Sequence, residues 1–314
     1  MKNPLSSARR RGFTLIELLV AMAITTVIVA VLVSITGVAV DTWQRGRSEI
    51  RASRQAKSML DTMAKDFESL VSRRGNNFEW LYTQVESQLP GPSANQSTNA
   101  AELIFFTAAT DRYEGNIGGT KDLGGDVSAV GYQLKWQDPV QGDEDDKSAT
   151  FVLYRLLVNP DQTFQDLLGK EDLEQAFSSK YSSKVADVEN FVCENVYQFT
   201  LTYQVEVTKP ASGGGAPQTF PVRVTLGDSG AGNEIRLRGN GIDAQKISTG
   251  SLSPQVTSEE LKAGRLTGVE IGITVLSDSA VIRLNNAALD QKVREKILAQ
   301  ESFQYSRTVE LPGM

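Results

Sequence analysis

The chain has 314 residues and a formal net charge of −6, from 32 Lys and Arg against 38 Asp and Glu. It has no histidine, which excludes Ser-His-Asp and Cys-His catalysis and histidine-ligated zinc, and its single cysteine, Cys193, excludes an internal disulfide or a cysteine metal cluster. Acidic chains are poor general nucleic-acid binders, because neutralising phosphate takes Lys and Arg. Composition therefore argues against most enzymes, and we expect no cofactor, no metal and no nucleic-acid partner.

A long apolar run follows a basic start. Residues 1–12 carry four Lys and Arg and no acid, and residues 13–40 carry one charge, Glu17. The 23 uncharged residues from Leu18 to Val40 exceed the roughly 20 apolar residues that a helix needs to cross a bilayer core. A carboxylate in such a helix costs up to ~2.5–3.5 kcal/mol at the bilayer centre and less near the end. This cost indicates that Glu17 has a function.

Two interpretations of this segment leave Glu17 unexplained. The first is a signal anchor or a cleaved secretory signal. Cleavage after Ala39 would satisfy the small-x-small rule, but the apolar run is far longer than the usual ~7–15 residues. A twin-arginine signal would use Arg10 and Arg11, although such signals are usually less hydrophobic than this one.

A third interpretation explains the whole segment. The run RRRGFTLIELLVAMAI resembles the class III signal of type IV pilins and pseudopilins, which has a basic leader ending in Gly, then Phe, then Glu at the fifth mature position. Those positions are Gly12, Phe13 and Glu17. The resemblance implies that a prepilin peptidase cuts between Gly12 and Phe13 and N-methylates Phe13. It also implies that Glu17 pairs with the amine of an adjacent subunit and sets the register of assembly.

The resemblance also divides the chain and orients it. It implies a cleaved leader (1–12), a transmembrane and filament-core helix (13–40), an amphipathic stalk helix (41–74) and a globular head (75–314). Lys and Arg number four in the leader and five in residues 44–57, so the positive-inside rule is indecisive. Orientation rests on the resemblance, which implies a single-pass inner-membrane protein with its head in the periplasm or outside.

Apolar residues continue at helical spacing beyond the span, at Ala56, Leu60, Met63, Phe67 and Leu70. This stripe predicts one helix from about residue 14 to about residue 72, packed under the head rather than against a partner coiled coil. The basic run 45–57 is open to three interpretations: lipid headgroups, the acidic head of a neighbouring subunit, or a solvated helix face.

The rest of the chain predicts an α+β fold with a mainly antiparallel sheet. Residues 75–100 read mostly as loop. Strands are expected over 103–107, 130–136, 151–158, 197–207, 220–226, 269–275 and 303–311, with a short helix around 289–297. Insertions are expected near 137–147, 160–187 and 209–264, and the second of these has a helical pattern.

Several of these segments extend the resemblance. The order AKDFESL, VGYQLKW, FVLYRLLV, VCENVYQFTLTYQVEV, GVEIGITVL and FQYSRTVELPG is similar to the J-type minor pseudopilins of type II secretion and to the W-type minor pilins. The J-type heads are usually smaller than this one. The chain also resembles the large pilin-like proteins of the Verru_Chthon cassette protein C group.

Three other features have a chemical and a plain interpretation. Ser229 lies in LGDSG, which resembles the nucleophile segment of trypsin-like proteases, but without histidine a Gly/Asp/Ser turn is favoured. Asp143–Asp146 lacks EF-hand spacing and favours a solvated acidic loop over a calcium site. Cys193 opens a buried strand and is expected to be a packed core thiol.

The sequence thus predicts a minor pilin or pseudopilin without enzymatic activity. Its expected partners are the prepilin peptidase, other minor and major pilins, and the inner membrane. One alternative is a filament-displayed adhesin or cargo-binding module that uses the insertions at 137–147 and 209–264. The other is a membrane-anchored hydrolase that uses Ser229.

Overall fold

The computed structural model describes residues 14–93, 95–108, 126–142, 148–209, 216–227, 232–286 and 288–311. The chain divides into two compact units, residues 1–48 and 49–314. In the first unit, the described residues belong to the start of helix α1 (Leu15–Glu68). Within the described part of the chain, α1 is the one helix long and apolar enough to cross a membrane. Its first half has exposed apolar side chains, such as Leu15 at 78%.

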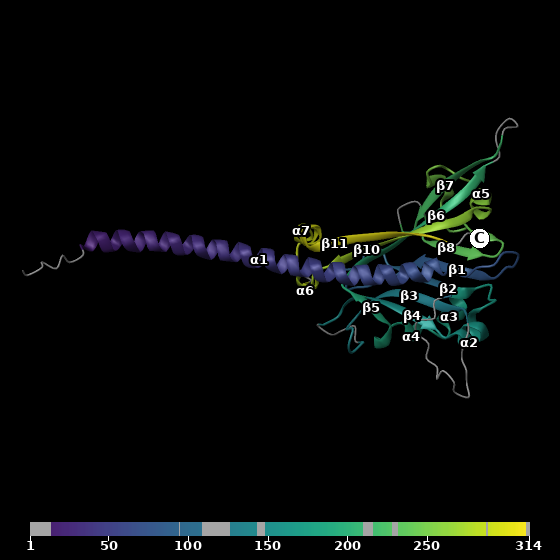
Figure 1. Ribbon diagram of the computed structural model, residues 1–314, viewed down its shortest axis with the longest axis horizontal. Coiled ribbons are helices and arrows are strands. Elements are labelled where there is room, and N and C mark those ends of the chain that lie inside the picture. Colours follow the sequence, from purple (N-terminus) through teal and green to yellow (C-terminus); the bar gives the residue numbers. More distant parts are fainter. Residues whose placement is uncertain are drawn as a thin grey trace, which may run out of the picture. The chain divides into compact units, whose positions relative to one another are not determined.

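The second unit contains two antiparallel sheets (Figure 1). The seven-stranded sheet has the order β5-β4-β3-β2-β1-β8-β9. Its strands are β1 (Glu79–Val85), β2 (Ala101–Thr107), β3 (Ser128–Gln137), β4 (Thr150–Val158), β5 (Phe191–Glu194), β8 (Glu234–Arg238) and β9 (Gly241–Asp243). The four-stranded sheet has the order β11-β10-β6-β7. Its strands are β6 (Val196–Lys209), β7 (Gln218–Thr225), β10 (Arg265–Leu276) and β11 (Ser302–Glu310). The predicted α+β class is confirmed.

The head half of α1 lies between the two sheets and supplies the centre of the main core (Figure 1). The five residues of the predicted apolar stripe are all buried, so the stripe packs within the head as expected. Phe67 stacks on Phe105 of β2 with ring centroids 4.5 Å apart. The helix ends at Glu68, four residues before the predicted end, because Leu70 leaves it to form a β-bridge with Thr107.

The other face of the seven-stranded sheet is covered by the insertion after β4. It contains α2 (Pro160–Gln162), the π-helical turn η1 (Thr163–Leu167), α3 (Leu173–Ser178), α4 (Ser182–Val185) and the 3-10 turn η2 (Val188–Asn190). Side chains from these turns form a second core against Tyr82, Ile104 and Phe106 of β1 and β2. The predicted helical character of residues 160–187 is confirmed.

Two regions of the head contain strands that were not predicted. Residues 75–100 are mostly loop, as expected, but they include β1, an interior strand of the seven-stranded sheet. The main core with α1 covers one face of β1 and the insertion after β4 covers the other, so EWLYTQV lacks the alternation that marks a half-exposed strand. The insertion 209–264 contains β7, which matches the strand predicted at 220–226. It also contains β8, β9, η3 (Thr249–Ser251) and α5 (Ser258–Lys262), which were not predicted.

The C-terminal region agrees with the prediction except for one added helix. α7 (Gln291–Glu301) is the short helix expected there, and it leads into β11. α6 (Asp278–Leu284) was not expected. Ser277 precedes it as the N-cap residue, and the Ser277 side chain accepts a hydrogen bond from the Ala280 backbone N–H.

Candidate functional site

Helix α1 begins with a reciprocal cap formed by Thr14 and Glu17. The Glu17 Oε2 atom accepts hydrogen bonds from the Thr14 backbone N–H and from its hydroxyl, both at 2.8 Å. The Thr14 hydroxyl in turn accepts the Glu17 backbone N–H at 3.3 Å. This is a capping box, which satisfies two of the backbone donors that a helix start leaves unpaired.

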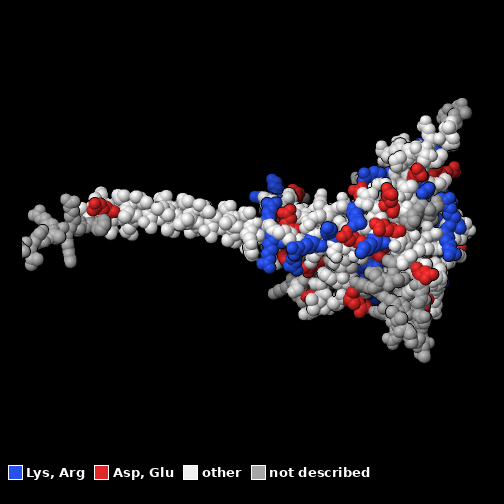
Figure 2. Space-filling view, in the orientation of Figure 1, with Lys and Arg blue, Asp and Glu red and all other residues white. Residues whose placement is uncertain are grey.

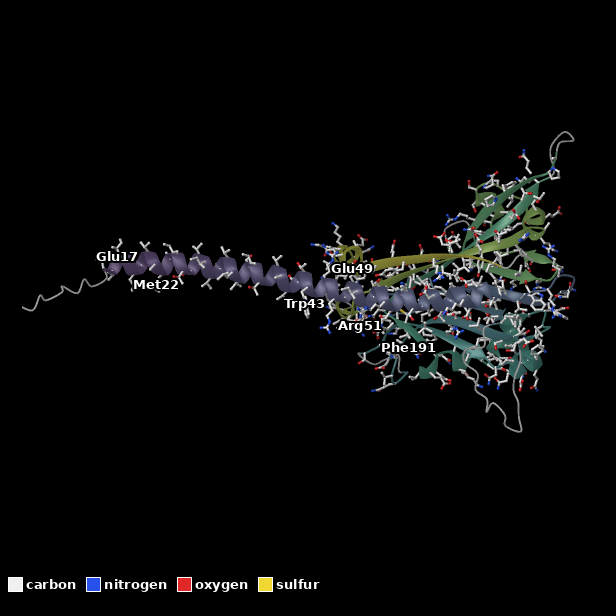
Figure 3. All side chains as sticks on the ribbon, in the orientation of Figure 1. Glu17, Met22, Trp43, Glu49, Arg51 and Phe191 are labelled. Carbon is white, nitrogen blue, oxygen red and sulfur yellow. The ribbon has the colours of Figure 1, made fainter. Side chains whose placement is uncertain are left out.

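The Glu17 carboxylate has spare capacity for a second partner. Glu17 is exposed among apolar side chains at the start of α1 (Figure 3). Both side-chain bonds use Oε2, and within the described residues no donor contacts Oε1. Gly12 and Phe13, the predicted processing residues, lie outside the described residues. The arrangement therefore leaves one carboxylate oxygen available to a donor from outside the described chain.

Sequence reasoning missed Thr14 as a site residue. The signal was present, because Thr14-Leu15-Ile16-Glu17 is a Ser/Thr-x-x-Glu capping pattern directly before an apolar run.

The far end of the apolar run carries an aromatic residue and a cation. Trp43 (Figure 3) is 64% exposed. The Arg47 guanidinium lies 5.6 Å from the centroid of the Trp43 ring. Tryptophan is enriched at the headgroup level of membrane helices because one side of its ring is apolar and the other polar. This end of the run therefore has the residue type of a membrane–water boundary.

A buried charged cluster holds the other end of α1. Asp66 is 1% exposed and accepts two hydrogen bonds from Arg155, each at 2.7 Å. The Tyr132 hydroxyl donates to the same carboxylate at 2.5 Å. Tyr132 and Arg155 are directly opposite each other on β3 and β4. Burial, with the Asp66 charge, raises the pKa of Tyr132 well above its usual value, so its hydroxyl stays protonated as a donor.

This cluster unites three motifs. Asp66 comes from AKDFESL, Tyr132 from VGYQLKW and Arg155 from FVLYRLLV, the first three segments that carry the J-type resemblance. The register of β3 and β4 places Tyr132 opposite Arg155, and the end of α1 supplies Asp66. The cluster fixes the helix on the sheet and has no open side for a ligand, because Asp66 and Arg155 are each 1% exposed.

One arginine of the basic run 45–57 pairs within its own head. Arg51 contacts Glu194 at 2.5 Å and Asp278 at 2.8 Å. It thus joins α1 to the end of β5 and the first turn of α6. None of the three interpretations of the basic run 45–57 included an ion pair within the same head. The pairs are solvent-exposed on the arginine side, where its side chain is 56% accessible.

Cys193, Ser229 and Asp143–Asp146, the other candidates for chemistry, form no catalytic or metal site among the described residues. Cys193 is fully buried in β5, as expected, and burial raises the pKa of its thiol to about 12. Ser229 and Asp143–Asp146 lie outside the described residues. Among the residues that the structure describes, no group of three or more Cys, Asp and Glu could hold a metal ion.

Residues 7–33 match the family model of the prokaryotic N-terminal methylation motif. No curated protein and no solved structure matches the chain. The match covers the basic start, Glu17 and the first part of α1. It supports a membrane-anchored subunit of the pilin or pseudopilin type, a class that is generally structural. The motif implies processing by a prepilin peptidase and assembly with other pilins.

Proposed function

We propose that the chain is a minor pilin or pseudopilin. It initiates or joins a type IV pilus-like or type II secretion filament after the peptidase cuts between Gly12 and Phe13 and methylates Phe13. The observation that carries this proposal is the motif match at 7–33, with Glu17 as the one charge among residues 13–40. A cut before the apolar run leaves the membrane anchor on the mature subunit.

The role proposed for Glu17 follows from the cost of an unpaired charge in lipid. Before processing there is no α-amine at Phe13, and the Thr14 cap supplies the local hydrogen bonds to Oε2. After processing, Oε1 is available to the methylated amine of an adjacent subunit. A carboxylate and an amine are tolerable together in an apolar setting and costly apart, so pairing favours one register between neighbours.

Two substitutions at Glu17 separate capping from charge pairing. Glu17→Gln keeps an oxygen that can accept the Thr14 hydrogen bonds but removes the charge, whereas Glu17→Val removes both. Both variants should insert and be processed, and both should assemble poorly, as measured by the yield of sheared filaments. Normal assembly of both would sink the pairing role, and normal assembly of the glutamine variant alone would assign Glu17 to capping.

The finer assignment is to the J-type minor pseudopilins or W-type minor pilins. It is supported by the meeting of Asp66, Tyr132 and Arg155, one from each of three motif segments. In this assignment the protein crosses the inner membrane once, with its head in the periplasm or outside. Protease added to intact spheroplasts should digest the head at residues beyond 74, and complete protection of the head would reverse the proposed orientation.

A further inference from the structure

β11 is an edge strand that lacks the features that usually protect a sheet edge. Its one neighbour in the sheet is β10, and its nine residues pair with β10 without a register shift. The other edge strands are short or interrupted, because β5 has four residues, β9 has three and β7 contains Pro221. The sequence of β11, SFQYSRTVE, has no proline and no lysine. Proteins use short strands, proline, lysine and bulges to keep edges from pairing, so β11 is open to an added strand.

The strand register determines which backbone groups of β11 face outward. The Leu311 N–H donates to the Thr267 carbonyl oxygen, so these two residues form a hydrogen-bonded pair at the end of the ladder. Hydrogen-bonded and non-hydrogen-bonded pairs alternate along an antiparallel ladder. Gln304, Ser306 and Thr308 therefore direct their N–H and C=O groups away from β10. All three residues are exposed, and the described part of the chain supplies no partner to these backbone groups.

The inner side chains of β11 lie against α1 (Figure 1). Tyr305 shares a side-chain hydrogen bond with Ser53, and Arg307 forms an ion pair with Asp61. Lys57 is four residues from both Ser53 and Asp61, so it lies on the same side of the helix and beside the edge. Lys57 is exposed, and it has no ion pair with any described residue. An unpaired cation therefore lies next to the outward backbone groups of β11.

An apolar side chain accompanies Lys57 on this side of α1. Ile50 lies seven residues before Lys57, which places it on the same side of the helix, and it is 56% exposed. The nearby acids leave Lys57 unmatched, because Asp61 is engaged by Arg307 and Glu49 lies about 12 Å away along the helix. Figure 2 shows Lys and Arg gathered along the head half of α1. The surface beside the edge is thus part apolar and part basic.

These features define the chemistry of a partner. A row of outward N–H and C=O groups binds an extended polypeptide, which adds as a strand. The side chains of such a strand alternate between the two faces of the sheet. One row would meet Gln304 and Ser306, which are polar and uncharged, and the other would meet Ile50 and Lys57 of α1. The matching segment therefore alternates polar residues with a second row that is apolar and carries an acid.

The same geometry disfavours a second copy of this chain as the partner. Two β11 strands would pair antiparallel about a two-fold axis. α1 runs in the same direction as β11, because Ser53 meets Tyr305 and Asp61 meets Arg307. A two-fold pair would therefore set the head halves of α1 in opposite directions, whereas subunits anchored in one membrane need the same direction. It would also bring two Lys57 side chains to the same face of the joined sheet, where like charges repel.

We propose that β11 binds an extended segment of a different protein as an added strand. The segment pairs with the backbone of Gln304, Ser306 and Thr308, and it places an acidic side chain against Lys57 and an apolar side chain against Ile50. The contact does not repeat between copies of this chain, which agrees with a minor subunit. It goes beyond the proposed filament role, because it gives the head a peptide-binding edge that does not depend on processing of the leader.

Selection of random peptides on the full chain in detergent micelles tests this edge. Phage-displayed peptides about as long as β11 are the probe. The enriched peptides should alternate apolar and polar residues and carry Asp or Glu in the apolar row. When a synthetic copy of such a peptide is bound, hydrogen exchange of the outward β11 amides should slow, because they then donate to the added strand, while exchange of the β7 amides should not change.

Two variants of one residue isolate the backbone contribution. Ser306→Pro removes the central outward N–H and leaves the ladder to β10 intact, because that N–H points away from β10. It should weaken peptide binding about tenfold, whereas Ser306→Ala keeps the N–H and should leave the dissociation constant within about twofold. Unfolding curves of the two variants in denaturant verify that both are folded.

A charge swap isolates the role of Lys57. Lys57→Glu should weaken binding of the acidic peptide about fivefold, and a twin peptide with Lys in place of the acid should bind this variant more tightly than the unaltered chain. Such a rescue cannot occur in a protein that has failed to fold. The matched control is Lys65→Glu, an exposed lysine two turns further along α1, which should change binding by less than about twofold.

Three results would overturn the proposal. The first is enrichment of no peptide above the background of empty micelles. The second is peptide binding that Ser306→Pro and Lys57→Glu leave unchanged, or that their controls weaken equally. The third is self-association of the full chain that Ser306→Pro abolishes, because it would assign the edge to a second copy. A methylated Phe13 terminus would still support the filament role in each case.

Discussion

Two carboxylates on α1 are held in opposite ways. Asp66 is buried in the head, where Arg155 and Tyr132 satisfy it through three hydrogen bonds. Glu17 is exposed in the apolar half, and its side-chain partner among the described residues is Thr14, three positions before it. The described residues thus supply three hydrogen bonds to Asp66 and leave the Oε1 atom of Glu17 without a donor.

The comparison separates stability from assembly. A charge whose partners belong to the same fold contributes to that fold, and removing one member takes a partner from a charge that stays buried. A charge in an apolar helix that keeps one oxygen open among the described residues can accept a donor from a neighbouring subunit. Substitutions at Asp66 should therefore change unfolding, whereas substitutions at Glu17 should change assembly and leave the head's unfolding as it was.

The largest effect is expected at Asp66. Asp66→Ala leaves the Arg155 guanidinium buried without its carboxylate, which should lower the free energy of unfolding of the head by about 3–5 kcal/mol. Denaturant titration of the full chain in detergent, followed by near-ultraviolet circular dichroism, measures this. Asp61→Ala is the matched control on the same helix. Because Asp61 is a partly exposed partner of Arg307, its loss should cost less than about 1 kcal/mol. Equal losses would refute the assignment of Asp66 as the anchor.

The next largest loss of stability is expected at Met63, and Met22 of the same helix serves as the comparison. Met63 is fully buried in the main core, whereas Met22 is 62% exposed in the apolar half. Met63→Ala should destabilise the head by about 2–5 kcal/mol, because it removes buried methylenes and leaves a cavity. Met22→Ala should leave head unfolding in the same titration unchanged. A comparable loss from both would contradict the division of the helix into two roles.

A smaller effect, with the opposite sign, is expected at Glu86. Burial raises the pKa of Glu86, opposed by Lys135 and by a hydrogen bond from Gln133, and its Oε1 atom is buried without a hydrogen-bond partner among the described residues. Since the raised pKa means that the folded head favours the protonated form, stability from this group is present at low pH and is lost as pH rises through the raised value. Glu86→Gln, which mimics the protonated form, should add about 1 kcal/mol at pH 7.

The gain from Glu86→Gln should shrink as the pH falls towards the ordinary Glu pKa of about 4.3, where the native carboxyl is already protonated. Unfolding curves at pH 7 and pH 4 measure the change. A gain that grows on acidification would contradict the burial argument.

The smallest stability effect is expected at Arg51. Its side chain is 56% accessible, so its pairs with Glu194 and Asp278 are screened by water and salt. Arg51→Ala should lower the free energy of unfolding by less than about 1 kcal/mol. This loss should become smaller as the salt concentration rises from about 0.05 M, where screening is weak, to about 0.5 M, where it is strong. A salt-independent loss above about 2 kcal/mol would show that Arg51 anchors the helix as Asp66 does.

The sequence predicted those parts of the molecule that a local pattern determines. The apolar stripe of α1 and the alternating strand at 197–207 were found because one face of each is buried. β1 was missed because both its faces are covered, which erases the alternation. Glu17 was found as an unexplained charge. The Asp66 cluster was not, because it depends on the register that puts Tyr132 opposite Arg155, which no local pattern reveals.

Intact-mass analysis of the mature chain from membranes tests the central claim most directly. We predict a mature chain that starts at Phe13, lacks residues 1–12 and carries one N-methyl group. Tandem fragmentation should place the added methyl on the terminal Phe13 amine. A chain that starts at Val40 would show a cleaved secretory signal, and one that retains Met1 would show no processing. Either result would contradict the assignment of a pilin-type subunit.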